Sequence, residues 1–386
     1  MRILFDHQAF EMQRIGGVSR SYAELISHLR DRGCDCTIGI KESDNVYLRE
    51  NNLVPKTKPL HYRHDLLFEG KKLFKGQRTL ARKALSLMGH YDDCLQINKE
   101  YCIKLLKKQL FDVFEPTFFD SYFLPYLKDK PFVMTVHDMI PELFPEFFPK
   151  DDFQIVQKKK LCPLASHIHV PSEKTKEDLV NILPIDPEKV SVIPHGRPEY
   201  DDDTCLLQPI VDFPYLLFVG ERDGYKNFSA FLGECSNIVK RFPEIRVVCT
   251  GKDFNEKEKK KIGELGFGEK VIHRFADESV LRNLYHFAVA FVFPSAYEGF
   301  GIPILEAFAN DCPVMLNHAS CFPEVAGDAA VFFDMNRKGD MYEKFVALYT
   351  SGLNNEMIQK GKSRLEKYSW NQSAESLKII YQSLLR

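Results

Sequence analysis

The chain has 386 residues, which is long enough for two or three domains. Hydrophobic residues make up 44% of it and charged residues 27%, as in an ordinary folded protein. A formal net charge of −2 argues against nucleic acid as the main partner, because phosphate backbones are bound by a strong basic excess. The first residues, MRILFDHQAF, lack the apolar core of a signal peptide, and no apolar run reaches the roughly 18 residues of a membrane span. The cysteines form no CxxC pair, so we expect reduced thiols and a cytoplasmic protein.

Short apolar runs alternate with amphipathic stretches nearly from end to end. The first half has candidate strands at residues 2–5, 36–40, 132–136, 167–170 and 190–193. The second half has candidates at 215–219, 246–250, 271–274, 290–293, 314–316 and 331–333. Helical patterns lie between them, for example at 18–32, 173–183, 227–241 and 281–287. This alternation predicts an α/β protein with parallel sheets covered by helices on both faces.

A segment without periodicity divides this pattern. Residues 195–214, HGRPEYDDDTCLLQPIVDFP, are rich in proline and aspartate, which is typical of an interdomain linker. Two doubly wound α/β domains of similar size are therefore expected. Because ligands of such sheets bind beyond the carboxyl ends of the strands, we expect a cleft between the two domains.

The most informative segment is residues 295–306, SAYEGFGIPILE. Its glycines lead from a buried strand into a helix that begins near Ile302, with Pro303 in the first turn, where proline is favoured. Such a loop presents free N–H groups and a partial positive charge, which suit a diphosphate. Glu298 and Glu306 lie on the loop and the helix, where carboxylates accept hydrogen bonds from sugar hydroxyls. From these residues alone, an alternative stays open, in which Glu298 caps the helix and Glu306 is a solvated surface residue.

Further candidates follow other strands. Arg222 and Lys226 come after the first strand of the second half, where cations stabilise a departing diphosphate. Gly16 and Gly17 precede a helix and allow an anion to approach closely. His137 follows the strand at 132–136 and faces the predicted cleft. Each has a simpler interpretation, as a solvated loop charge, an ordinary turn or a structural histidine.

Together these motifs resemble the Glu-x7-Glu signature of the retaining GT-B glycosyltransferases of family 4. The resemblance continues through the Pro-Val, Pro-Glu-Val and Gly-Asp-Ala motifs that follow, and covers nearly the whole chain. It implies that Glu298 contacts the hydroxyls of the donor sugar and Glu306 the ribose of the nucleotide. The amides around Gly299, Phe300 and Gly301 would hold the sugar and the phosphates.

The same resemblance gives roles to the other candidates. It implies that Arg222 and Lys226 grip the diphosphate, although an extra residue separates the preceding glycine from Arg222 in this chain. It further implies that Gly16 and Gly17 meet the donor phosphate or the acceptor when the domains close. His137 would lie beside the donor sugar.

For the whole chain, the resemblance implies two Rossmann-like domains facing across a cleft. Residues 1–195 would form the acceptor-side domain and 196–369 the donor-binding domain, with a helix at 370–386 packing back on the first. The expected reaction is a retaining, metal-independent transfer, without a cofactor, from a GDP- or UDP-linked sugar such as mannose. A polysaccharide or a lipid-linked saccharide would be the acceptor. A sugar-nucleotide epimerase, a glycosyl phosphorylase and a non-catalytic scaffold with the same fold stay open as alternatives.

Residues 71–88, KKLFKGQRTLARKALSLM, predict a basic helix. Lys71, Lys75, Arg78 and Arg82 form a stripe at helical spacing, and no acidic residue interrupts the segment. Such a helix suits a peripheral contact with anionic lipid at the inner membrane face. A helix that packs on the core and exposes a solvated basic face is an equally good interpretation.

Overall fold

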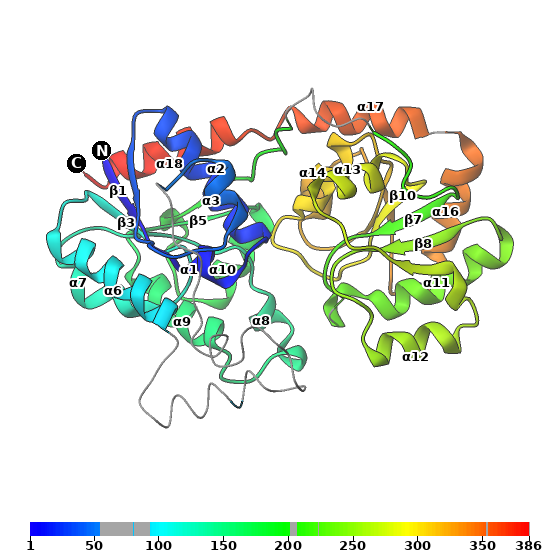
Figure 1. The fold of residues 1–386 in the computed structure, drawn as a ribbon, viewed down its shortest axis with the longest axis horizontal. Coiled ribbons are helices and arrows are strands. Elements are labelled where there is room, and N and C mark those ends of the chain that lie inside the picture. The colour runs from blue at the N-terminus through cyan, green and yellow to red at the C-terminus, as the bar shows by residue number, and fades with distance from the viewer. Residues whose placement is uncertain (55–79, 81–92, 201–206, 223, 353, 386) are drawn as a thin grey trace.

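The computed structural model describes residues 1–54, 80, 93–200, 207–222, 224–352 and 354–385. It contains two α/β domains that lie next to each other (Figure 1), which confirms the predicted fold class. The helix predicted at 71–88 lies, apart from Leu80, outside the described residues.

The first domain is built on parallel strands in two three-stranded sheets, joined by an isolated parallel bridge. The strand order is β2-β1-β3 in one sheet and β4-β5-β6 in the other, and Phe114 of β3 bridges to Phe132 beside β4. The strands are β1 (Arg2–Phe5), β2 (Asp35–Ile38), β3 (Val113–Glu115), β4 (Val133–Thr135), β5 (His167–Val170) and β6 (Val190–Val192). Because all the pairs are parallel, the strands end along one edge.

Helices connect these strands and cover them. They are α1 (Gln8–Met12), α2 (Gly17–Asp31), α3 (Val46–Glu50), α6 (Asp93–Lys108), α7 (Leu124–Leu127), α8 (Ile140–Leu143), α9 (Phe153–Leu161) and α10 (Glu173–Ile182). Helix α2 buries Tyr22, Leu25, Ile26 and Leu29, the spacing of one helical face, against the sheet core. Its first residues are thereby fixed beyond the end of β1.

The second domain has one six-stranded parallel sheet with the order β12-β11-β10-β7-β8-β9. The strands are β7 (Tyr215–Phe218), β8 (Arg246–Cys249), β9 (Val271–His273), β10 (Ala290–Phe293), β11 (Val314–Asn317) and β12 (Val331–Phe333). The chain builds outward in opposite directions from β7 and β10. This is a topological switch point, where doubly wound sheets bind ligands.

The helices of the second half are α11 (Phe228–Arg241), α12 (Glu256–Glu264), α13 (Glu278–His286), α14 (Ile302–Ala309), α15 (Phe322–Ala326), α16 (Asp340–Ser351), α17 (Asn354–Leu365) and α18 (Trp370–Ser383). The last of them, α18, leaves the second domain and runs along the first, beside α2 (Figure 1). Trp370, Leu377 and Tyr381 of α18 are buried in the same core as α2, and the Tyr381 hydroxyl bonds to the buried Glu115 carboxylate. The two domains are therefore linked twice.

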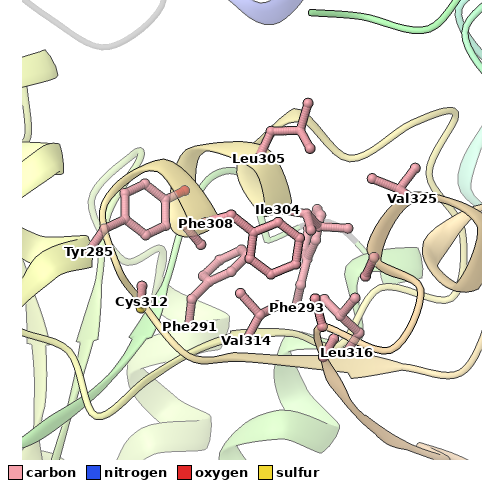
Figure 2. Close-up of a cluster of buried hydrophobic side chains, with 14 of the residues drawn as sticks. Tyr285, Phe291, Phe293, Ile304, Leu305, Phe308, Cys312, Val314, Leu316 and Val325 are labelled. Atoms are coloured by element: carbon pink, nitrogen blue, oxygen red, sulfur yellow. The ribbon is translucent and has the colours of Figure 1, made fainter. Parts of the chain in front are cut away.

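Helix α14 is held on the sheet by its apolar face. Ile304 and Phe308 point toward Phe291, Phe293 and Val314 of the strands below (Figure 2), and all five are buried. Burying a side chain of this size contributes about 1.5–3 kcal/mol. This packing fixes the N-terminus of α14, and with it the glycine loop, beyond the end of β10.

The predicted strands agree with those observed to within two residues at each end, but β3 was not predicted. This strand is only three residues long and carries Glu115, a charged residue that is buried completely. Its carboxylate accepts hydrogen bonds from His169 and Tyr381, which are distant in sequence, so no local sequence pattern predicts these partners.

Candidate active site

The loop between β10 and α14 is shaped by two glycines. Gly301, the N-cap of α14, has a φ of 92°, in the left-handed region that favours glycine. A Cβ atom at Gly299 would lie 1.8 Å from the carbonyl oxygen of His137 in the first domain. Only glycine permits this approach, so the loop sits directly against the opposite domain.

Lys226 and Glu298 form an ion pair at this loop. The Lys226 Nζ lies 2.5 Å from Glu298 Oε1, and both side chains are about 15% exposed or less. Two further bonds hold their loops together: Ala296 N donates to the Tyr225 carbonyl at 2.8 Å, and the Asn227 side chain donates to the Pro294 carbonyl at 3.0 Å. The structure thus brings together two of the predicted site residues, a cation and a carboxylate that are 72 positions apart.

The first domain holds the same loop from the other side. Ser172, the N-cap of α10, donates its hydroxyl to the Gly299 carbonyl at 2.6 Å, and Thr175 donates to the same oxygen at 3.0 Å. Glu324 of the second domain accepts hydrogen bonds from the backbone N–H groups of Glu173 and Lys174. Two N–H groups at the N-terminus of α10 are therefore satisfied by the second domain and a third by Ser172, and the cleft is closed here.

A cavity of about 690 Å³ lies between the two domains. From the first domain, its wall includes Gly16 and Gly17 at the start of α2. From the second, it includes Ile302 and Glu306 of α14 and Gly220 after β7. A Cβ at Gly17 would be 3.5 Å from the Ile302 side chain, so the starts of α2 and α14 lie face to face.

Glu306 points into this cavity and is not a solvated surface residue. Its side chain is 12% exposed, and its two oxygens accept hydrogen bonds from Arg20 Nη1 and from the Tyr285 hydroxyl, both at 3.1 Å. Burial raises the pKa of Glu306, while Arg20 and Tyr285 oppose that rise. Glu298 does not line this cavity, and neither do residues 299–301, which lie between it and α14 in the sequence.

Arg222 is turned away from the predicted diphosphate site. Its guanidinium donates to Glu258 at 2.7 Å, to the Thr250 carbonyl at 3.0 Å and to two carbonyls of the following loop. It lies against the rings of both Phe228 and Phe254, which contact each other, and its side chain is 4% exposed. Glu258 is fixed by the capping box of α12, so it offers the guanidinium a ready partner. The structure therefore separates Arg222 from the pair formed by Lys226 and Glu298.

His137 presents its backbone, rather than its ring, to the glycine loop. The ring packs against Tyr22 and His195, and Nε2 is buried without a hydrogen-bond partner. Burial lowers the pKa of His137 to about 4 and that of His195 to about 3, so both rings are neutral near pH 7. Among the described residues, no group of three or more His, Cys, Asp or Glu side chains is arranged to hold a metal ion.

Phe300 anchors the loop from inside. Its ring is buried against His195 and Tyr368, with centroids 5.0 and 5.6 Å away. The Cys321 thiol lies 3.2 Å from the carbonyl oxygens of both Glu298 and Phe300. The side chain of Phe300 thus packs in the protein interior, which leaves its backbone as the part available to a ligand.

Sequence reasoning missed Arg20, Ser172 and Tyr285. Ser172 carried a usable signal, because a serine before an amphipathic run is typical of a helix N-cap. Arg20 follows the Gly-Gly pair within one turn of the same helix, so its position at the cavity could also have been inferred. The contact of Tyr285 with Glu306 could not be inferred from the sequence, because it depends on the packing of α13 against α14.

Two protein-family models match the chain. The model described as "Glycosyltransferase Family 4" matches residues 15–198, and the one described as "Glycosyl transferases group 1" matches 208–364. The two matches cover both domains. The chain belongs to the family 4 glycosyltransferases.

Two bacterial relatives are O-antigen enzymes by name. The chain is 28% identical over 211 residues to O-antigen chain mannosyltransferase RfbU of Salmonella typhimurium, covering 54% of this chain and 58% of that protein. It is 26% identical over 238 residues to O-antigen chain mannosyltransferase B of Escherichia coli, covering 56% and 60%. The chain thus matches little more than half the length of these curated relatives.

Solved structures match over nearly the full length. A glycosyltransferase from Rickettsia africae superposes with a TM-score of 0.69 at 15% identity, covering 100% of this chain and 98% of that one. HepE from Anabaena, solved with UDP and glucose, gives 0.69 at 14% identity, covering 98% and 99%. These likenesses establish the GT-B fold, two Rossmann-like domains on either side of a cleft.

In the part of the chain that the structure describes, no helix is both long enough and apolar enough to cross a bilayer.

Proposed function

We propose that this chain transfers a sugar from a nucleoside-diphosphate sugar to a saccharide acceptor. The observation that carries the proposal is the Lys226–Glu298 ion pair beside the N-terminus of α14. Ile302 and Glu306 of this helix line the cavity, whereas Glu298 precedes the helix and does not line it. We assign the nucleoside to the cavity, with the ribose at Glu306, the diphosphate to the start of α14, and the sugar to Glu298.

The charges suit the departure of a diphosphate. As the glycosidic bond breaks, negative charge grows on the leaving phosphate, and Lys226 together with the positive end of the α14 dipole stabilises it. Placed donors of this kind are worth about 2.7–4 kcal/mol each in the transition state. Arg222 then acts indirectly: its bond to the Thr250 carbonyl holds the loop after β8, which forms part of the cavity wall.

We propose a retaining reaction that needs no metal ion. The acceptor hydroxyl attacks from the face that the diphosphate leaves, and the leaving phosphate takes the hydroxyl proton, so no protein nucleophile is required. The predicted role of His137 beside the sugar is carried by its backbone carbonyl, which lies against Gly299 at the loop.

The cavity favours guanine over uracil as the base. Besides Glu306, which is assigned to the ribose, its wall carries the carboxylates of Glu50, Asp277 and Glu278, which as ions only accept hydrogen bonds. Guanine offers N1–H and the N2 amino group along one edge, whereas uracil has a single N–H flanked by carbonyls. We therefore propose a GDP-linked sugar, and mannose is the first to test because the relatives above are named mannosyltransferases.

We propose that the acceptor, a growing polysaccharide or a lipid-linked saccharide, meets the donor from the side of the first domain. The names of the O-antigen relatives support a polymer of the bacterial surface. A cytoplasmic site of action, with peripheral contact at the inner membrane face through residues 71–88, stays a prediction.

The test is to incubate the protein with GDP-mannose, UDP-glucose or UDP-galactose, with and without a lipid-linked saccharide acceptor. Release of GDP that depends on the acceptor, with a product whose anomeric configuration matches the donor by NMR, is expected. Conversion of the donor without acceptor would indicate an epimerase instead. Binding of the donor without any turnover would favour the scaffold, and an inverted product would contradict the retaining mechanism.

A further inference from the structure

One side chain of the first domain reaches across the cavity to two helices of the second. Arg20, on the first turns of α2, places Nη1 3.1 Å from Glu306 Oε1 on α14 and Nη2 3.6 Å from Glu278 Oε1 at the start of α13. Its guanidinium also lies 5.9 Å from the ring centroid of Tyr47, and its side chain is only 14% exposed. A buried charge held by two partners is fixed in place.

Without Arg20, closure of the cleft would bring like charges together. Glu50 belongs to the first domain and Glu278 to the second, and both line the same cavity as Glu306. Burial raises the pKa of Glu50, and the Glu278 carboxylate raises it further, as expected for two acids facing each other. The other arginine of this wall, Arg282, is stacked 4.0 Å from the Tyr200 ring. Among the described residues of this wall, Arg20 is thus the cation that lies between the acids of the two domains.

We propose that Arg20 is a positioning residue for the donor: it holds the cleft closed and keeps the Glu306 carboxylate aimed at the ribose. The inference rests on the proposed function, because it takes the cavity as the nucleotide site. Each carboxylate oxygen has two acceptor positions, so Glu306 can bond Arg20, Tyr285 and the ribose hydroxyls together. Binding of the donor therefore does not require Arg20 to leave.

The bridge also controls the protonation of Glu306. Burial raises the pKa of this carboxyl group, and Arg20 is the strongest influence against that rise; Tyr285 also lowers the pKa, and Glu278 raises it. Loss of Arg20 therefore raises the pKa of Glu306 further. A protonated carboxyl group gives up an acceptor position, so the nucleotide affinity of a variant without Arg20 should fall at a higher pH than that of the wild type.

The experiment is calorimetric titration of the full chain with GDP, and separately with UDP, across roughly pH 5.5–8.5. Arg20→Met should weaken binding about ten- to hundredfold near neutral pH, as expected for a lost charge-assisted bond. Its affinity should fall further toward acid pH, with the midpoint above that of the wild type. Arg20→Lys should recover part of both effects. Arg49→Met removes an exposed ion pair outside the cavity wall and serves as the control.

Wild-type affinity and an unchanged pH profile in Arg20→Met would overturn the inference. If that variant fails to fold, Arg20→Gln also removes the charge, and wild-type affinity with an unchanged pH profile in that variant would overturn the inference as well. A wild-type chain that binds neither GDP nor UDP would instead overturn the proposed function, so the two failures are distinguishable.

Discussion

We expect Gly299→Ala, which adds a single methyl group, to lower turnover strongly while changing the stability of the fold little. In the closed cleft, the added Cβ of Gly299→Ala would lie 1.8 Å from the His137 carbonyl oxygen. Because real Cβ atoms do not come within 3.0 Å of such atoms, the two groups must part by about 1.2 Å. They belong to different domains, so the strain is relieved by opening the cleft, at the expense of the Ser172 bond to the Gly299 carbonyl.

The expected effect follows from this displacement. Misplacing a catalytic group by about 1 Å costs on the order of a hundredfold in rate, or about 2.7 kcal/mol in the transition state. Neither sheet core includes Gly299, so we expect the melting temperature to change by only a few degrees. Initial rates of GDP release and thermal unfolding measure the two quantities. The control is Gly263→Ala on α12, where the Cβ meets nothing within 4 Å. Wild-type turnover in Gly299→Ala would refute the closed cleft as the active form.

Three further outcomes follow from buried titratable groups. Lys158→Met leaves Glu142 buried without its cation and should lower the free energy of unfolding in urea by about 3–5 kcal/mol. The double variant Lys158→Met/Glu142→Leu should recover most of this loss. Equal losses in the single and double variants would contradict the prediction. In the folded protein the pKa of His195 is lowered to about 3, so below about pH 6.5 the unfolded state binds one more proton and the free energy of unfolding decreases as the pH falls. His195→Phe should reduce that slope by up to roughly 1.4 kcal/mol per pH unit. Arg222→Met should cost about 2 kcal/mol in unfolding and weaken GDP binding, and calorimetry showing intact binding would contradict its role in the wall.

The fold could be predicted well from the sequence because buried parallel strands are short apolar runs between helical patterns. The strand at Ala290–Phe293 and the helix after it were placed correctly, since Pro294 and the following glycines mark their ends. Strand β3 could not be predicted, because Glu115 is stabilised by partners from β5 and α18. Such partners are set by tertiary packing, and no local spacing encodes them.

Loop positions in the site were predictable, but side-chain directions were not. Lys226 follows β7 and Glu298 follows β10, and these strands are neighbours in the sheet of the second domain, so the proximity of the two side chains follows from the topology. Arg222 lies on the same loop as Lys226 but turns toward Glu258, 36 residues later, whose position depends on the capping box of α12. Arg20 acts across the cleft, and only the packing of the two domains brings it to Glu306.

The most direct test compares the affinities of GDP and of GDP-mannose in three variants, because it needs no acceptor. Glu298→Gln should weaken binding of GDP-mannose while leaving GDP unchanged, since its carboxylate is assigned to the sugar. Lys226→Met and Glu306→Ala should weaken both ligands, since these residues are assigned to the diphosphate and the ribose. If all three variants bind GDP and GDP-mannose as tightly as the wild type does, the assignment of this cleft as the site of sugar transfer is contradicted.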